Sequence, residues 1–315
     1  MSRYGIIING ETMDKTKKMM LDVATLYYKE NMTQQKIAET LNITRQTVSK
    51  LLKNAVDKKV VEIHINAPDE TVRRLEKAIS DKFGIAEVVV GSAASDGDLL
   101  RKAATVRAAS AYLTSIICGG NKKIGVAWGK TVEEVIAEIP ETITANNVVF
   151  PLLGATMKDT SCYYTNKLAE DLAKKVGAAV NYAYFPYVVS AEDAKLIKQT
   201  SFYKEIETLW KNTDLAVVGI GNLDAVNTVR KLFGKTKLAS DICGDIATHI
   251  FDENGNFISL GENTLCASRQ DVVAAKKTVA VAYGKRKCAA IKAAMKTGMV
   301  DVLITDEYTA AEILA

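Results

Sequence analysis

A cluster of polar side chains between Thr33 and Lys53 has the residue types that hydrogen bond to DNA. A guanidinium such as that of Arg45 can make two hydrogen bonds to a guanine edge, and an amide such as that of Gln46 can make two to adenine. The threonines, the first glutamine and the lysines suit phosphate oxygens, which position a protein on a duplex without reading its sequence. We predict DNA contacts from Thr33, Gln34, Thr44, Arg45, Gln46, Ser49, Lys50 and Lys53.

Two short helices joined by a tight turn would place these side chains on one surface. Thr33 can cap a helix over 34–40, and Thr44 can cap a second helix that runs to about residue 54. Helices that cross over such a turn need a small residue where they touch, a turn former and apolar residues between them. Counted from Gln34, the fifth, ninth, fifteenth and eighteenth positions supply these as Ala38, Asn42, Val48 and Leu51. The alternative is an ordinary helical hairpin with a solvated polar face, but the four spacings and the local positive charge favour a helix-turn-helix.

Flanking segments complete a predicted winged module over residues 1–65. Apolar residues at helical spacing, Met19 and Leu21 among them, predict a preceding helix over 14–30. After the second helix, the run "DKKVVEIHI" at 57–65 is typical of a lysine-bearing turn that leads into an alternating strand, as in a wing. His64 lies on the polar face of that strand and is expected at the surface rather than as a ligand.

The charge distribution separates a basic head from a neutral body. Residues 1–60 hold eleven Lys and Arg against six Asp and Glu, a balance of +5, while the whole chain has a net charge of +4. The rest of the chain therefore sums to −1. This asymmetry indicates that the head meets a polyanion and that the body has another task.

Composition excludes several classes of protein. Apolar residues make up 48% and charged residues 25% of the chain, and no apolar run approaches the roughly 18 residues of a membrane span. Five cysteines are scattered singly, without a CxxC pair or a Cys/His cluster, so we expect neither a disulfide framework nor a metal site. We expect a cytoplasmic protein with no membrane partner and no cofactor.

The remaining chain predicts a linker and a doubly wound α/β domain. Residues 66–86 are expected to be a linker with a helix over 71–83, whose apolar seam could help two subunits pair. From residue 87 to 315, β-rich and helical segments alternate, which predicts a parallel sheet with helices on both faces. An Asn-Gly pair in "FDENGNF" at 251–257 predicts one hairpin that interrupts the pattern. The strands are expected over 87–90, 123–127, 148–152, 181–185, 215–220, 278–282 and 300–305.

Glycine-bearing segments are expected at the carboxyl ends of these strands, where such folds bind ligands. They are "GVAWGKT" at 125–131, "PLLGAT" at 151–156, "GIGN" at 219–222, "CGDI" at 243–246 and "AYGKRK" at 282–287. Helix N-termini and Lys287 would take a phosphate, and the Asp245 carboxylate would take sugar hydroxyls. Each segment also has a plainer interpretation as a turn, because none matches a nucleotide-binding fingerprint. Lys130 and Lys285 are more simply solvated, and His249 and the cysteines more simply packing residues.

The ordered set of motifs resembles the SorC/DeoR-type family of bacterial sugar-responsive transcriptional regulators. The likeness extends from about residue 14 to the end and includes "TQQKIAETLNITRQTVSKLL", "IGVAWGKT", "VGIGNL", "CGDIATHIFDENG" and "GKRKCAAIKAAMKTGMVDVLITDEYTAAEIL". It implies a winged helix-turn-helix followed by an effector domain similar to the sugar-phosphate isomerase/deaminase and CoA-transferase fold. It also implies a homo-oligomer, dimer or tetramer, that changes its hold on operator DNA when a sugar or sugar phosphate binds.

The resemblance carries effector-binding roles to individual positions and also shows two departures. Leu153 stands before Gly154 where Lys or Arg is sometimes found, so a Schiff base or an arginine–phosphate contact is absent there and a monophosphate or free sugar is favoured. Tyr283 replaces a glycine of the lysine loop and would narrow the pocket. The predicted effector-binding residues are Gly125, Trp128, Gly129, Lys130, Thr131, Gly154, Gly219, Gly221, Asp245 and Lys287.

The leading hypothesis is therefore a sequence-specific repressor of a carbohydrate-utilisation operon, controlled by a sugar-type effector. An enzyme, a sugar-phosphate isomerase or deaminase with an appended DNA-binding module, is the alternative, although no acid/base pair stands at a recognisable spacing. A constitutive DNA-binding scaffold without an effector is the third.

Overall fold

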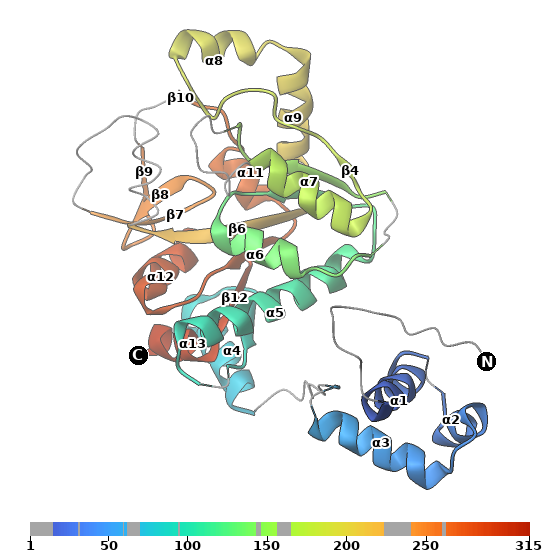
Figure 1. The fold of residues 1–315 in the computed structure, drawn as a ribbon. Helices are drawn as coiled ribbons and strands as arrows, with labels where there is room; N and C mark the ends of the chain where they lie inside the picture. Colours follow the sequence, from blue (N-terminus) through green and yellow to red (C-terminus); the bar gives the residue numbers. More distant parts are fainter. Residues whose placement is uncertain are drawn as a thin grey trace. The chain divides into compact units, whose positions relative to one another are not determined.

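The computed structural model describes residues 15–30, 32–58, 60–61, 70–93, 95–142, 146–155, 165–223, 241–259 and 263–315. The chain divides into two units, Met1–Ala67 and Pro68–Ala315, called here the head and the body. The elements of each unit are labelled in Figure 1. The predicted wing from residue 62 onward, with His64, lies outside the described residues.

The head contains the two predicted helices of the helix-turn-helix. α2 spans Gln34–Leu41 and α3 spans Arg45–Asp57. Each begins at a threonine whose hydroxyl accepts a backbone hydrogen bond, Thr33 from Lys36 N at 3.3 Å and Thr44 from Thr47 N at 3.1 Å. Asn42 between them adopts the left-handed conformation, with φ 53° and ψ 48°. The sequence prediction of this segment is confirmed.

The helix before α2 differs from its prediction in register. α1 spans Lys15–Ala24 and continues into a π-helical turn over Thr25–Lys29. Met19 and Leu21, expected on the buried stripe, are 42% and 44% exposed, whereas Met20 is 2% exposed. A π-helical turn holds one residue more than an α-helical turn, so the pattern of the later residues cannot be extended back into α1.

The described part of the body contains a sheet of ten strands. Seven strands run parallel in the order β1-β12-β11-β6-β2-β3-β4, and β7, β8 and β9 extend β6 in antiparallel fashion. A separate antiparallel pair joins β5 Val188–Val189 to β10 Asn263–Thr264. The sheet strands are β1 Glu87–Gly91, β2 Lys123–Val126, β3 Val148–Pro151, β4 Ala179–Val180, β6 Leu215–Asn222, β7 Ile242–Ile246, β8 His249–Asp252, β9 Phe257–Ile258, β11 Thr278–Val281 and β12 Val302–Asp306.

Helices cover both faces of this sheet, as predicted (Figure 1). Successive residues of a central strand alternate between two cores, with Val217 in one and Val218 in the other. One core includes α5 Asp98–Ile117, α6 Lys130–Glu138 and α7 Thr165–Val176. The other includes α4 Glu70–Phe83, α8 Ala191–Ile197, α9 Ser201–Lys211, α11 Arg269–Ala274, α12 Cys288–Lys296 and α13 Glu307–Leu314. None of the helices in the described ranges is long and apolar enough to cross a membrane.

Two predictions for the strands of the body need correction, and the predicted hairpin is confirmed. The strand expected over 181–185 is β4, which ends at Val180, because the chain then leaves the sheet and Phe185 packs against Tyr203 and Trp210. "CGDI" is not a loop after a strand but lies within β7, paired with β6. The hairpin at Asn254-Gly255 is confirmed between β8 and β9.

The helix expected in a linker lies inside the body instead. α4 packs on β1 and α13, and its Val72 and Ile79 are buried. Glu76 accepts a hydrogen bond from Val90 N at 3.0 Å, which ties α4 to the end of β1. The apolar seam that could have paired two subunits is thus used against the chain's own sheet.

Candidate DNA-reading surface and ligand site

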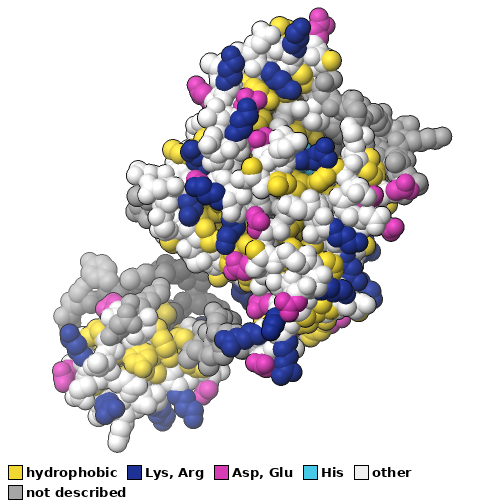
Figure 2. Space-filling view, turned by 180° about the vertical axis from the view of Figure 1, so that it is seen from behind, with side chains coloured by type: hydrophobic (Ala, Val, Ile, Leu, Met, Phe, Trp, Pro, Cys, Tyr) yellow, Lys and Arg dark blue, Asp and Glu magenta, His cyan; other side chains and the backbone are white. Residues whose placement is uncertain are grey.

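The polar face of α3 is exposed in the head. Val48, Leu51 and Leu52 point into the core of the head, with Val48 fully buried. Figure 2 shows Lys and Arg side chains around the head, interspersed with Asp and Glu side chains. The predicted DNA contacts Thr33, Thr44, Arg45, Gln46, Ser49, Lys50 and Lys53 are exposed, and Gln34 is half-buried.

Residues from both helices meet at one hollow of this surface. Arg45 of α3 borders it together with Thr33 and Gln34 at the start of α2. The Thr33 hydroxyl accepts from Lys36 N, so its own proton remains available to a phosphate oxygen. Tyr28, 42% exposed, lines the same hollow and was not predicted as a contact. Its neighbour Tyr27 packs edge-on against it at 4.9 Å, which orients its ring.

In the body, several predicted ligand residues lie where parallel strands end. Val126 of β2 pairs with Val217 of β6, and Val281 of β11 pairs with Gly219. The loops that follow β2 and β11 therefore flank the carboxyl-terminal half of β6. There β7 runs antiparallel to β6 and sets Asp245 opposite Gly221.

Asp245 and Lys287 are the charged pair of this edge. Asp245 is 5% exposed, and burial raises the pKa of its carboxyl to about 6, although Lys287 and the backbone N–H of Thr248 act in the opposite sense. Burial lowers the pKa of the half-buried Lys287, opposed by Asp245 and Glu134. Asp245 Oδ1 makes no hydrogen bond within the part of the chain that is described. A ligand with a hydroxyl and an anionic group would satisfy both charges.

An aromatic pair forms a wall beside this carboxylate. The ring of Trp128 lies 6.1 Å from that of Tyr187, centroid to centroid. Tyr187 is 2% exposed, and its pKa is raised by burial and also by the charges of Cys266 and Asp245, against a contact with Thr248 that lowers it. It was missed in the sequence because it stands in an irregular segment, which Tyr187 N fixes by donating to Ala155 O at 2.8 Å.

The turn between β7 and β8 is strained. Ile246 pairs with His249, so only Ala247 and Thr248 connect the strands, with φ of 46° and 75°. Such turns favour Asn-Gly, and a residue with a Cβ in this region costs roughly 1–2 kcal/mol. Thr248 is 7% exposed, and its hydroxyl also has no hydrogen bond among the described residues. The sequence carries no turn signal here that could have revealed it.

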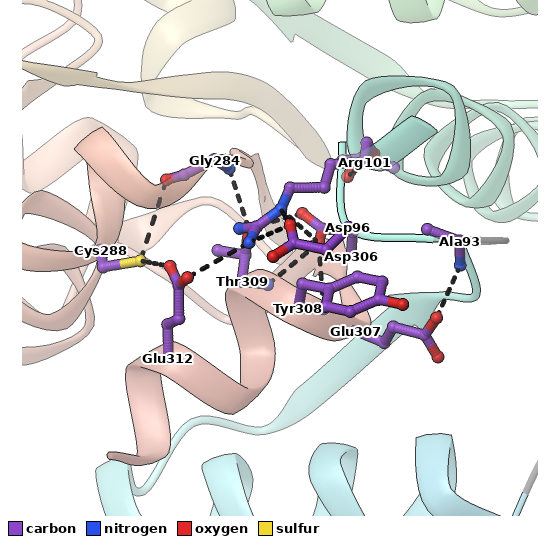
Figure 3. Close-up of polar contacts among 11 residues, drawn as sticks. Ala93, Asp96, Arg101, Gly284, Cys288, Asp306, Glu307, Tyr308, Thr309 and Glu312 are labelled. Carbon is purple, nitrogen blue, oxygen red and sulfur yellow. Dashed lines mark hydrogen bonds and ion pairs between the residues drawn. The ribbon is translucent and has the colours of Figure 1, made fainter. Parts of the chain in front are cut away.

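A buried arginine network anchors the loop that carries Lys287 (Figure 3). Gly284, with φ 96°, donates its N–H to Thr309 Oγ1 at 2.8 Å, and Lys287 N donates to Gly284 O at 2.9 Å. Arg101 of α5 donates to the same Thr309 hydroxyl at 3.3 Å. Its other donors reach Asp96 at 2.7 Å and Glu312 at 3.2 Å. The loop therefore has one defined position relative to α5 and α13.

The structure gives other predicted ligand residues different surroundings. A side chain at Gly125 would begin 2.5 Å from Leu152 Cδ2, so this glycine serves the packing of the sheet. Gly154 has the same role, because a Cβ there would lie 2.7 Å from Phe185 O. Lys130 is exposed at the start of α6, whereas Thr131 beside it is buried. Gly129, with φ 135° and open space beside it, leaves room for a ligand at that helix start.

Comparisons with known proteins cover both units. Residues 68–315 match a family model described as "Putative sugar-binding domain", and residues 21–58 match one described as "Sigma-70, region 4". The chain is 29% identical to the sorbitol operon regulator of Klebsiella pneumoniae, over 94% of this chain and 98% of that one. It is 28% identical to the deoxyribonucleoside regulator of Bacillus subtilis, over 96% and 99%. The crystal structure of full-length SorC from Klebsiella pneumoniae superposes with a TM-score of 0.83 at 27% identity, covering 95% of this chain and 98% of that one.

Proposed function

The chain belongs to the SorC family of DNA-binding transcriptional regulators, and we propose that a sugar or sugar phosphate sets its affinity for operator DNA. We expect a repressor of a carbohydrate-utilisation operon. The relatives named above are a sorbitol operon regulator and a deoxyribonucleoside regulator, names that support a carbohydrate-derived effector.

One observation carries the effector part of the proposal. Asp245 and Lys287 oppose each other at the carboxyl edge of the sheet, and the Asp245 Oδ1 atom has no partner within the described residues. A buried carboxylate accepts hydrogen bonds from hydroxyls, and a half-buried lysine attracts a phosphate. The loop of Lys287 is already fixed by the Arg101 network, so the site is preorganised for a small, polar, anionic ligand.

The exposed face of α3 supports the DNA part. Arg45 and Gln46 stand at the first turn of that helix, where a recognition helix contacts base edges in the major groove. The effector can change DNA affinity only by binding one conformer of the protein more tightly than the other. For a repressor, that conformer is the one with low affinity for the operator.

Fluorescence anisotropy with labelled duplex from the region upstream of its own gene tests the proposal. We expect tight binding that weakens steeply with salt and is released by at least one member of a panel of sugars, polyols and sugar phosphates. The same compound should raise the melting temperature, because it binds the folded state alone. Equal DNA affinity with every compound, and no thermal shift with any, would contradict the proposal.

A second candidate function is an isomerase or deaminase of sugar phosphates. The observation in its favour is the pKa of Asp245, raised to about 6 beside Lys287, because such tuning is typical of acid/base catalysts. The named relatives are regulators rather than enzymes. Incubation of the protein with phosphorylated sugars, followed by chromatography of the products, decides between the two. Steady turnover would establish the enzyme.

We further propose that the protein acts in the cytoplasm as a homodimer or homotetramer. A helix-turn-helix protein reads two half-sites about 34 Å apart through the two-fold axis of a dimer. Light scattering on the eluting protein, with and without a duplex, measures the assembly.

A further inference from the structure

Thr248 is distinctive in the body because its hydroxyl is buried without an ordinary hydrogen bond to any described residue. Its Oγ1 has no hydrogen bond among the described residues, and the residue is only 7% exposed. Asp245, three positions earlier on the same hairpin, has an Oδ1 atom in the same condition. Folding has removed both atoms from water without replacing their hydrogen bonds. Two unsatisfied groups on one hairpin indicate that a third group arrives to bind both.

The backbone of the hairpin ties the two residues together. The N–H of Thr248 hydrogen bonds to the Asp245 carboxylate and stabilises its charge. Thr248 takes φ 75°, a region where branched residues are rare. Strain of this kind persists where the surroundings and the function require it. The same residue therefore orients the carboxylate and presents a hydroxyl close to it.

The two side chains complement a hydroxyl group. An ionised carboxylate only accepts hydrogen bonds, whereas a threonine hydroxyl can donate one. A ligand hydroxyl can thus donate to Asp245 Oδ1 and accept from Thr248 Oγ1 at the same time. A carbonyl oxygen has no proton for the carboxylate, and a methylene leaves both protein groups unsatisfied.

Neighbouring side chains shield this position from water. Burial raises the pKa of Tyr187 and of Cys266, and weak hydrogen-bonding contacts with the Thr248 hydroxyl lower both. Neither contact has the distance and angle of an ordinary hydrogen bond, so the hydroxyl keeps its capacity for a ligand. The ring of Trp128 packs beside that of Tyr187. In such surroundings a missing hydrogen bond costs more than it does in water.

We propose that Thr248 is a specificity-determining residue which, together with Asp245, binds one hydroxyl of the ligand and excludes the corresponding deoxy compound. This proposal rests on the proposed function, because it names how the effector site selects its ligand. It adds a residue two positions beyond the segment 243–246 from which Asp245 was predicted.

Titration calorimetry on the full-length protein tests it with matched pairs. The probes are D-ribose 5-phosphate with 2-deoxy-D-ribose 5-phosphate, and D-glucose 6-phosphate with its 2-deoxy and 3-deoxy forms. We expect the wild type to prefer the hydroxylated member of at least one pair by about tenfold or more. Thr248→Val keeps the branched shape and the backbone strain but removes the hydroxyl. It should lose about ten- to a hundredfold in affinity for the hydroxylated compound and little for the deoxy one.

Thr305→Val is the matched control. Thr305 is also a fully buried threonine whose hydroxyl has no hydrogen bond among the described residues, but it lies on β12, two strands from β6. This variant should keep both the affinity and the preference of the wild type. Thr248→Ser, which retains a hydroxyl, should keep the preference and rules out a general effect of altering the turn.

The outcomes separate the two proposals. If Thr248→Val binds and discriminates as the wild type does, Thr248 has no such role, while the effector site itself stands. If the wild type favours the deoxy compound of every pair that it binds, the inference also fails. If it binds no probe of any pair, that counts against the proposed function, and the inference falls with it.

Discussion

The proposed functional groups of the head are exposed to solvent, whereas those of the body are buried. On the head, the polar side chains of α3 are exposed and fully solvated before any partner arrives. In the body, the Oδ1 atom of Asp245 and the hydroxyl of Thr248 are buried and lack ordinary hydrogen bonds among the described residues. The first surface costs the free protein almost nothing, whereas the second lowers its stability until a ligand binds. Substitutions on the exposed face of α3 should therefore change DNA affinity alone, and those at Asp245 or Thr248 should change stability and ligand affinity together.

The largest effect is expected from removing both charges of the body site. Asp245→Asn combined with Lys287→Met should weaken effector binding by at least about a hundredfold, because two hydrogen bonds to charged groups are lost. DNA affinity without effector should stay within about twofold. Anisotropy titrations of the duplex with effector measure both values. Lys285→Met, which removes an exposed lysine of the same loop, is the control and should respond as the wild type does. Equal loss in both variants would show that the loop acts only through its net charge.

The dependence of stability on pH sharpens the contrast within the body. The pKa of Asp245 is raised to about 6 from the ordinary 3.8, so the folded protein holds a proton that the unfolded chain releases between these values. Stability should fall as pH rises through this window, by at most about 3 kcal/mol, and the loss is complete above it. Asp245→Asn should then be more stable than the wild type at pH 7 and equal to it near pH 4, as measured by urea unfolding.

Asp214 should change stability with pH in the opposite direction, and it serves as the control. Burial alone would raise its pKa, but Lys276 and the N–H of Lys123, at 2.7 Å and 2.8 Å, lower it overall. The ionised Asp214 carboxylate therefore stabilises the folded protein at neutral pH, and this contribution is lost as the pH falls through the pKa of the folded state. Asp214→Asn should therefore destabilise the protein at pH 7, and the difference from the wild type should shrink as the pH falls below 3.8. If both asparagine variants destabilise at pH 7, the burial of Asp245 is not costly.

The same contrast explains what could be predicted from the sequence. The caps at Thr33 and Thr44 act over three residues, so spacing alone predicts α2 and α3. The central strands β11 and β12 are buried throughout, and their continuous apolar runs were equally clear. Asp245 and Lys287 were candidates because they follow predicted strands, and the family resemblance then favoured them. Neither spacing nor composition alone joins residues on different elements.

Features that depend on distant contacts escaped prediction. Tyr187 reaches the site only because its segment bridges to residues near Ala155. Thr248 is significant only once Ile246 and His249 are known to pair. The helix α4 looked like an isolated amphipathic helix, because its partners β1 and α13 lie partly at the other end of the chain. Where the sheet brings together segments that are distant in the sequence, local sequence patterns do not predict their contacts.

On the head, substitutions of Arg45 and Lys53 should distinguish sequence-specific DNA binding from attraction by charge alone. Arg45→Ala should cost about 1–3 kcal/mol on the preferred operator and less on other sequences, because a bidentate base contact is lost. Lys53→Ala should weaken binding to all sequences alike and reduce the slope of affinity against salt by about one ion. Anisotropy at several salt concentrations, with operator and scrambled duplexes, measures both. Uniform loss in both variants would contradict the assignment of α3 as the recognition helix.

The smallest effect concerns one backbone conformation in the head. Asn42 ends α2 with φ 53° and ψ 48°, which glycine adopts freely and a branched residue does not. Asn42→Val should destabilise the head by about 1–2 kcal/mol, whereas Asn42→Gly should change it by a few tenths. Both tryptophans, Trp128 and Trp210, belong to the body, so tryptophan fluorescence follows the body and circular dichroism follows both units. With Asn42→Val, part of the dichroism should melt earlier while the fluorescence transition stays in place. A fluorescence transition that moves with it would mean that head and body unfold together, and the contrast drawn between them would then not extend to stability.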